Sequence, residues 1–173
     1  MRTPEEKLGG NVETFMPEKA WGETSAHDIE RMTFPEIQWV VPGILPEGLT
    51  ILAGKPKAGK SWLVLSLAAS VAYGGVALGS IDVDSGDVLY LALEDNQRRL
   101  QDRMRYLQPD STMPARLFFE TDAPRVNGGL VDSLECWLDN HPRARLIIID
   151  TLQRARPRTS GNNSYKEDYE AVQ

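Results

Sequence analysis

A glycine-rich loop between two apolar segments constrains this chain more than any other feature. Residues 54–61 fit the pattern G-x-x-x-x-G-K-[ST], which is typical of a loop that holds phosphate with its backbone amides. The apolar run before it, 49–53, predicts a buried strand, and residues 61–73 after it predict a helix that is apolar on nearly every face. A strand, a phosphate loop and a helix in this order favour an α/β fold with a ligand site at the loop.

The residue types of the loop suit a nucleoside triphosphate. Gly54 and Gly59 permit the close approach and the backbone torsions that let amides converge on a phosphate. Lys60 supplies a charge that reaches the β- and γ-phosphates, and the Ser61 hydroxyl is placed to ligate Mg²⁺. A Gly- and Lys-rich surface turn would match the same pattern, but the flanking segments favour the phosphate loop. We therefore expect ATP and Mg²⁺ as ligands and these nucleotide-binding residues: Gly54, Lys55, Pro56, Lys57, Ala58, Gly59, Lys60 and Ser61.

Apolar runs and helical patterns alternate along the rest of the chain. Further strands are predicted at residues 87–93, 116–120 and 146–149. Leu100, Met104 and Leu107 share the apolar face of a helix that begins near Asp95 or Asn96. Four alternations predict a mostly parallel sheet with helices on both faces. The remaining expected elements are a helix at about 129–140, a helical turn at 25–32, a strand-like segment at 37–41, a polar loop at 154–163 and a helix beginning at 164.

Two carboxylates end predicted strands. Asp150 follows an apolar run and so lies at the carboxyl edge of a parallel sheet, where it could complement Ser61 in holding Mg²⁺. Glu94 ends the 87–93 run and is the expected catalytic base that activates the attacking water, with Lys60 the other catalytic residue. Asp95 could instead be the base, with Glu94 paired to an arginine of the next helix. A helix cap is the alternative role for Asp150.

Composition limits the class of protein. The 173 residues, 41% hydrophobic and 25% charged, suit one domain with a real core, which we expect at 25–173 after a flexible arm at 1–24. We find no leader and no apolar stretch long enough to cross a membrane.

The single Cys136 cannot form an internal disulfide, so we expect a cytoplasmic protein in which Cys136 fills the core. His27 and His141 have no Cys or His neighbours at metal-ligand spacing, which argues against a zinc site. The net charge of −6 does not indicate a basic nucleic-acid face, although a ring-shaped motor needs only a few loops.

Three blocks of sequence together resemble the RecA-like ATPases of the RepA helicase type, which are related to DnaB and RadA. The blocks are LPEGLTILAGKPKAGKSW (45–62), LALEDNQRRLQDR (91–103) and LIIIDTL (146–152). The resemblance covers residues 30–173 and agrees in order and spacing. It implies a RecA-like P-loop fold with the catalytic glutamate at Glu94 and the magnesium aspartate at Asp150.

The same resemblance implies a DNA replication helicase of plasmids, phages or mobile elements. Such a protein assembles as a homo-hexameric ring and binds single-stranded DNA. In RecA-like sheets the strand after the magnesium aspartate lies between that strand and the phosphate-loop strand, so we expect the sheet of this chain to be incomplete at its carboxyl end. The sensor residue and the arginine finger would then lie beyond Gln173. The alternative is a nucleotide-dependent binding or regulatory module of the helicase-loader type. A small-molecule kinase is a third possibility, but no lid or acceptor site is visible.

Overall fold

The computed structural model describes residues 24–108 and 112–157, and the chain divides into two units between Glu36 and Ile37. The described part of the first unit, residues 24–36, contains one short helix, α1 (Ala26–Arg31). Its amino-terminal cap is Ser25, whose Oγ accepts a hydrogen bond from the Asp28 amide at 3.1 Å, so the predicted helical turn is confirmed. Nearly all of the expected arm and the helix expected from residue 164 lie outside the described residues.

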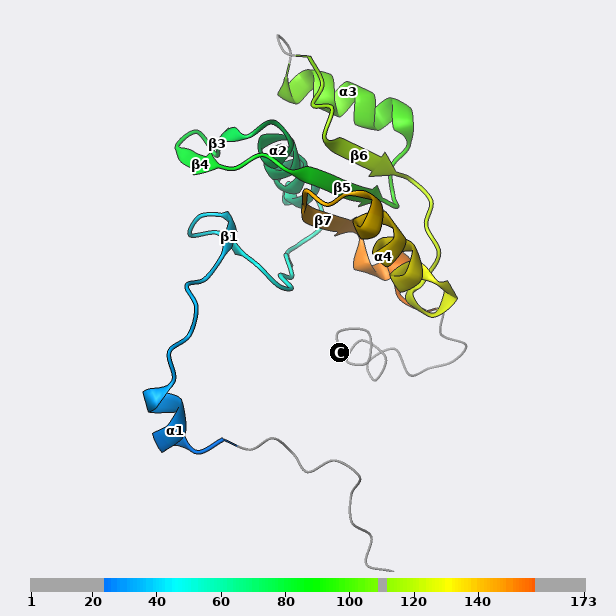
Figure 1. The fold of residues 1–173 in the computed structure, drawn as a ribbon. Coiled ribbons are helices and arrows are strands. Elements are labelled where there is room, and N and C mark those ends of the chain that lie inside the picture. The colour runs from blue at the N-terminus through cyan, green and yellow to red at the C-terminus, as the bar shows by residue number, and fades with distance from the viewer. Residues whose placement is uncertain (1–23, 109–111, 158–173) are drawn as a thin grey trace, which may run out of the picture. The chain divides into compact units, whose positions relative to one another are not determined.

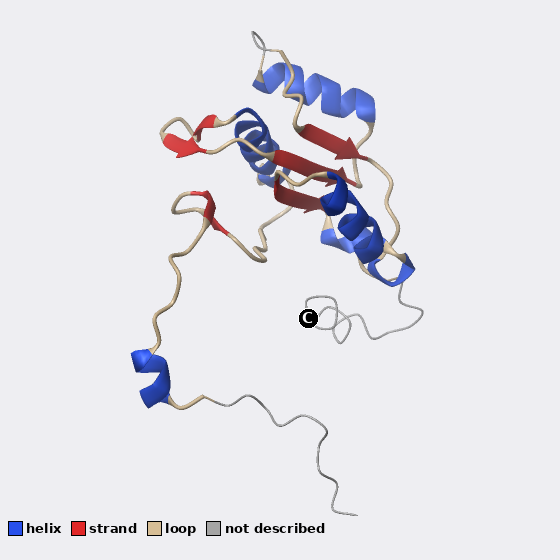
Figure 2. Ribbon diagram, in the orientation of Figure 1, coloured by secondary structure: helices blue, strands red, loops and turns tan. Residues whose placement is uncertain are grey.

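A parallel three-stranded sheet forms the centre of the second unit (Figures 1 and 2). Its strands, in spatial order, are β6 (Leu117–Glu120), β5 (Asp87–Ala92) and β7 (Ala144–Asp150). All three were predicted to within two residues at each end. The sheet is parallel because the α-helix between β5 and β6 and the α-helix between β6 and β7 return the chain to the same end of the sheet. The predicted α/β class is therefore correct.

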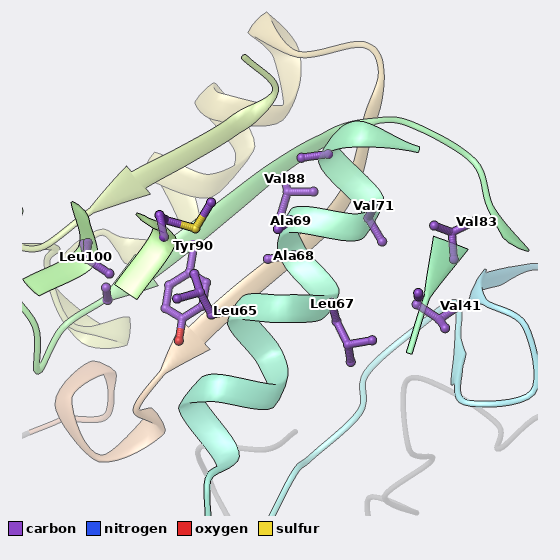
Figure 3. Close-up of a cluster of buried hydrophobic side chains, with 14 residues drawn as sticks. Val41, Leu65, Leu67, Ala68, Ala69, Val71, Val83, Val88, Tyr90 and Leu100 are labelled. Carbon is purple, nitrogen blue, oxygen red and sulfur yellow. The ribbon is translucent and has the colours of Figure 1, made fainter. Parts of the chain in front are cut away.

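Helices cover both faces of this sheet, as the alternation predicts. They are α2 (Lys60–Tyr73), α3 (Gln97–Leu107), α4 (Leu130–Asn140) and the short α5 (Leu152–Ala155), with a 3₁₀ turn η1 (Val126–Gly128) before α4. Alternate residues of β5 point to opposite faces. Val88, Tyr90 and Ala92 pack with α2 and α3 (Figure 3), whereas Leu89 and Leu91 pack with α4 and α5.

Helix α2 is the most deeply buried helix of the described residues. Leu65, Ala68 and Val71 are fully buried, and the helix packs against both β5 and β7. Burial of each large apolar side chain contributes about 1.5–3 kcal/mol to folding. The helix that carries the phosphate loop is thus fixed against the strands that carry the two carboxylates.

The predicted strand at 49–53 is not a strand in the structure. These residues have no ladder partner, and the side chains of Leu49, Ile51 and Leu52 are 78%, 59% and 48% exposed. Strand β7 pairs only with β5 within the described part of the chain, so its other edge offers no ladder to this run. The expectation of a buried strand is wrong because apolar composition alone cannot form a strand. The run needs hydrogen-bonding partners and a cover for its side chains.

Two small antiparallel hairpins flank the sheet. The first joins β1 (Trp39–Val41) to β2 (Leu45–Pro46) and includes part of the expected strand-like segment at 37–41. The second, β3 (Gly75–Ala77) with β4 (Ile81–Val83), was not predicted. Its turn has Leu78 and Gly79 at φ values of 49° and 82°, the paired positive values that suit a tight hairpin. The available sequence signal was Gly79-Ser80 between short apolar runs.

Two smaller expectations are also wrong. The first two residues of the expected polar loop, Arg154 and Ala155, instead end helix α5, because Ala155 is buried against the sheet. Cys136 is exposed rather than a core residue, since it lies off the α4 stripe formed by Leu130, Leu134 and Trp137. Within residues 24–108 and 112–157, no helix is both long and apolar enough to cross a bilayer.

Candidate nucleotide site

The phosphate loop leads directly into the amino terminus of α2. Gly59 caps the helix at a φ of +86°, a left-handed value that glycine adopts without strain. No side chain caps this end, and no acidic residue lies in the first turn. The first-turn amides and the positive end of the helix dipole therefore face an exposed loop, which suits an anion.

Lys60 closes the loop in this structure. Its Nζ donates hydrogen bonds to the carbonyl oxygens of Gly54, at 2.8 Å, and Lys55, at 2.9 Å. The ammonium is thus already held over the loop, where a bound phosphate would find it. The side chains of Lys55 and Lys57 are exposed.

Glu94 and Asp150 lie at the same edge of the sheet. Ala92 pairs with Asp150 in the ladder, and the Leu93 amide donates to the Asp150 carbonyl at 2.8 Å. Just beyond the ends of the two strands, the Thr151 hydroxyl donates to Glu94 Oε1 at 3.0 Å. Arg154 lies 3.8 Å from the same oxygen, and the Glu94 side chain remains 52% exposed. A half-exposed carboxylate held on one oxygen can still reach a water molecule with the other.

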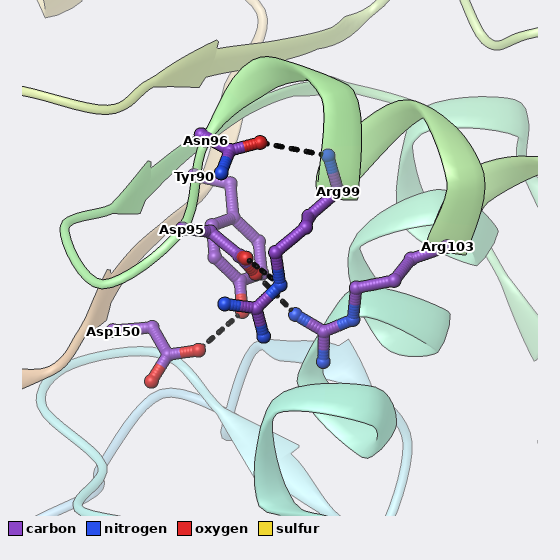
Figure 4. Close-up of polar contacts among 6 residues, drawn as sticks. All are labelled: Tyr90, Asp95, Asn96, Arg99, Arg103 and Asp150. Atoms are coloured by element: carbon purple, nitrogen blue, oxygen red, sulfur yellow. Dashed lines mark hydrogen bonds and ion pairs between the residues drawn. The ribbon is translucent and has the colours of Figure 1, made fainter.

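The hydroxyl of Tyr90 fixes the Asp150 carboxylate. Tyr90 is 1% exposed and donates a hydrogen bond to Asp150 Oδ2 at 2.7 Å (Figure 4). Burial, and then the hydrogen bond to Asp150, raise the pKa of the Tyr90 hydroxyl far above its usual value, so it remains a donor. Sequence reasoning missed this residue. A lone hydroxyl in an otherwise apolar buried strand was the available signal.

Asp95 is bound by two arginines of α3 (Figure 4). Arg99 Nε lies 3.0 Å from Oδ1, and Arg103 Nη1 lies 2.5 Å from Oδ2, while the Asp95 side chain is only 9% exposed. The alternative interpretation assigned a helix arginine to Glu94, but the structure gives both to Asp95. Asn96, not Asp95, caps α3, since its side chain accepts from the Arg99 amide at 3.0 Å. Asp95 is therefore committed to ion pairs, whereas Glu94 is accessible.

Arg103 is largely buried although it is charged. Whereas the side chain of Arg99 on the same helix is 63% exposed, that of Arg103 is only 13% exposed. Its guanidinium lies 4.7 Å from the centre of the Trp62 ring, on the first turn of α2. The structure thus connects the block that holds the phosphate loop to the block that holds Glu94, and Thr151 connects Glu94 to the block that holds Asp150.

The donor set fits Mg²⁺ that arrives with a nucleotide. Among the described residues there is no group of three or more His, Cys, Asp or Glu side chains able to hold a metal. One hydroxyl, Ser61, and one carboxylate, Asp150, are hard oxygen ligands of the kind that Mg²⁺ uses when phosphates and water complete its shell.

Comparison with known proteins identifies the family. A family model described as an AAA domain matches residues 13–173, which is most of the chain. The chain belongs to the AAA domain family. This AAA protein is therefore a P-loop ATPase, in agreement with the α/β sheet and the phosphate loop. No solved structure matches the chain.

Proposed function

We propose that this AAA protein hydrolyses Mg²⁺-bound ATP at the edge formed by α2, β5 and β7 and uses the reaction to act on DNA as a replication helicase. The observation that carries the ATPase part is the accessible Glu94 carboxylate, hydrogen-bonded to Thr151 beside Asp150. The DNA part is supported by the three blocks at 45–62, 91–103 and 146–152, which resemble RepA-type helicases in order and spacing.

Each group in the site has a role in this proposal. The amides of the loop and of the first turn of α2 bind the β-phosphate, and Lys60 moves from the loop carbonyls to the β- and γ-phosphates. Ser61 and Asp150 hold Mg²⁺, with Tyr90 orienting the Asp150 carboxylate. Bound Mg²⁺ supplies neutralisation of the charge that develops on the phosphate oxygens.

Glu94 acts as the general base. Its free oxygen orients a water molecule in line with the γ-phosphorus and takes up a proton as the water attacks, while the bond from the γ-phosphorus to the bridging oxygen breaks and ADP leaves. The Thr151 hydroxyl holds the other oxygen of Glu94 beside Asp150, so the distance between the base and the metal ligand stays fixed. Phosphoryl transfer depends mainly on such positioning and on charge stabilisation.

The experiment that tests this function measures ATP turnover by the intact protein with and without single-stranded DNA, together with unwinding of a forked duplex. The proposal predicts turnover that requires Mg²⁺, rises with single-stranded DNA and supports strand separation. Turnover that DNA leaves unchanged, with no unwinding, would reject the helicase and favour a loader or regulatory ATPase. Absence of turnover would reject the ATPase mechanism itself.

A further inference from the structure

One side chain connects the turn after β5 to the first turn of α2. Arg103 projects from α3 and pairs through Nη1 with Asp95 Oδ2 at 2.5 Å, and its guanidinium lies 4.7 Å from the Trp62 ring centre. Asp95 follows Glu94 directly, and Trp62 follows Ser61 directly. The two residues that Arg103 contacts are therefore each one position away from a residue of the nucleotide site.

Arg103 and its neighbour Arg99 differ in how far their side chains are buried. Both guanidinium groups pair with Asp95, but the Arg99 side chain is 63% exposed and that of Arg103 only 13%. An exposed ion pair is screened by water and contributes little, whereas removing one partner of a buried pair leaves an uncompensated charge. Arg103 is thus the partner that determines where Asp95 sits.

Arginine suits this position because one planar group must do two things. Its edge donates to a carboxylate while its face covers an aromatic ring, and it keeps its charge at every physiological pH. Lysine offers only a compact point charge and cannot make both contacts equally well. Tyr106, one turn further along α3, meets the Trp62 ring edge-on at 5.5 Å, so the helix holds Trp62 at two points.

We propose that Arg103 is a positioning residue that holds the Glu94 turn at a fixed distance from the Ser61 end of the phosphate loop. This inference rests on the proposed function, in which Glu94 and Ser61 act on the same nucleotide. The Glu94 side chain itself is half-exposed, and beyond its contacts to Thr151 and Arg154 its place depends on the backbone turn that Asp95 anchors. Hydrolysis needs the base aligned with the γ-phosphate, and misplacement by about 1 Å can cost about 100-fold in rate.

The test compares Arg103→Gln and Arg103→Lys with Arg99→Gln, a control that removes the exposed partner of the same carboxylate. We expect Arg103→Gln to lower kcat by about 10–100-fold while nucleotide affinity stays within about threefold. Arg103→Lys should recover part of the rate, and Arg99→Gln should stay within about twofold of the unsubstituted protein. Equal kcat values for Arg103→Gln and Arg99→Gln would overturn the proposal.

Combination with Glu94→Gln separates positioning from a general structural effect. If Arg103 acts through Glu94, adding Arg103→Gln to Glu94→Gln should lower the single-turnover rate by less than about twofold. A loss as large as in the unsubstituted background would overturn the proposal. Should Arg103→Gln not fold, Arg103→Lys takes its place in both comparisons.

Hydrogen exchange tests whether Arg103 anchors the turn at Asp95 without relying on ATP hydrolysis. The Asp95 amide donates to the Ala92 carbonyl at 3.0 Å, and Arg103→Gln should speed its exchange about tenfold while Arg99→Gln leaves it unchanged. Unchanged exchange in Arg103→Gln overturns the positioning role even where the protein turns over ATP. Faster exchange in a protein that does not hydrolyse ATP supports the anchor and rejects only the proposed function.

Discussion

Tyr90→Phe isolates one hydrogen bond at the centre of the site. The phenylalanine ring keeps the packing of Tyr90, whose ring centre lies 5.7 Å from that of Phe119, and removes only the hydroxyl that donates to Asp150 Oδ2 at 2.7 Å. Hydrogen bonds to charged groups contribute about 1.5–3 kcal/mol, and Asp150 is partly exposed, so water replaces part of the loss. We expect the free energy of unfolding to fall by about 1–2 kcal/mol.

The effect on nucleotide chemistry should be larger than the effect on folding. A group that orients a metal ligand typically changes metal affinity or activity by about 10–100-fold when it is removed. We therefore expect Tyr90→Phe to raise the Mg²⁺ concentration needed for half-maximal ATP turnover by at least about tenfold. Urea unfolding and a Mg²⁺ titration of turnover give the two quantities.

Phe119→Leu is the matched control for packing. It removes the ring that lies against Tyr90 but leaves the hydroxyl and Asp150 in place. We expect it to lower stability without moving the Mg²⁺ midpoint. An unchanged Mg²⁺ midpoint in Tyr90→Phe, or the same shift in Phe119→Leu, would refute the orienting role of the hydroxyl.

Three further predictions follow from the same site. Lys60→Ala should reduce ATP affinity or turnover by at least about 100-fold, since it removes the charge expected on the phosphates, and calorimetric titration with ATP checks this. Glu94→Gln should bind ATP with nearly unchanged affinity but hydrolyse it at least about 100-fold more slowly; wild-type kinetics in this variant would move the base elsewhere. The raised pKa of Tyr90 predicts that, without metal, stability falls as pH rises above about 10, because only the unfolded chain then releases the proton. The slope, up to about 1.4 kcal/mol per pH unit, should be smaller in Tyr90→Phe, as unfolding at pH 9 to 11 will reveal.

Local patterns predicted most of the central architecture. Strands β5, β6 and β7 were readable because they are short apolar runs bounded by polar residues or turns, and α3 was readable from Leu100, Met104 and its polar opposite face. The hairpin of β3 and β4 was not predicted because its strands have three residues each, too few to show an alternating pattern.

Residues 49–53 show the limit of pattern reasoning on the fold. Their composition is that of a strand, but pairing and burial depend on what lies beside them, and no ladder partner occurs among the described residues. The sequence of this run favours a strand, but tertiary contacts determine whether the strand forms.

The sequence predicted those site residues that belong to a local motif or end an apolar run. It did not predict the contacts between residues that are far apart in the chain. Lys60, Glu94 and Asp150 each follow from local context. The Tyr90 hydroxyl on Asp150 and the Arg103 guanidinium on Trp62 join residues 60 and 41 positions apart, and no local pattern specifies such pairs. These contacts depend on how α2, α3 and the sheet pack.

A crystal structure of the protein with Mg²⁺ and a non-hydrolysable ATP analogue tests the central claim most directly. The account predicts that Lys60 leaves the carbonyls of Gly54 and Lys55 for the phosphates, that Ser61 and Asp150 flank the metal, and that Glu94 faces the γ-phosphate. Phosphates bound away from the amino terminus of α2, or a Glu94 carboxylate turned away from them, would contradict it.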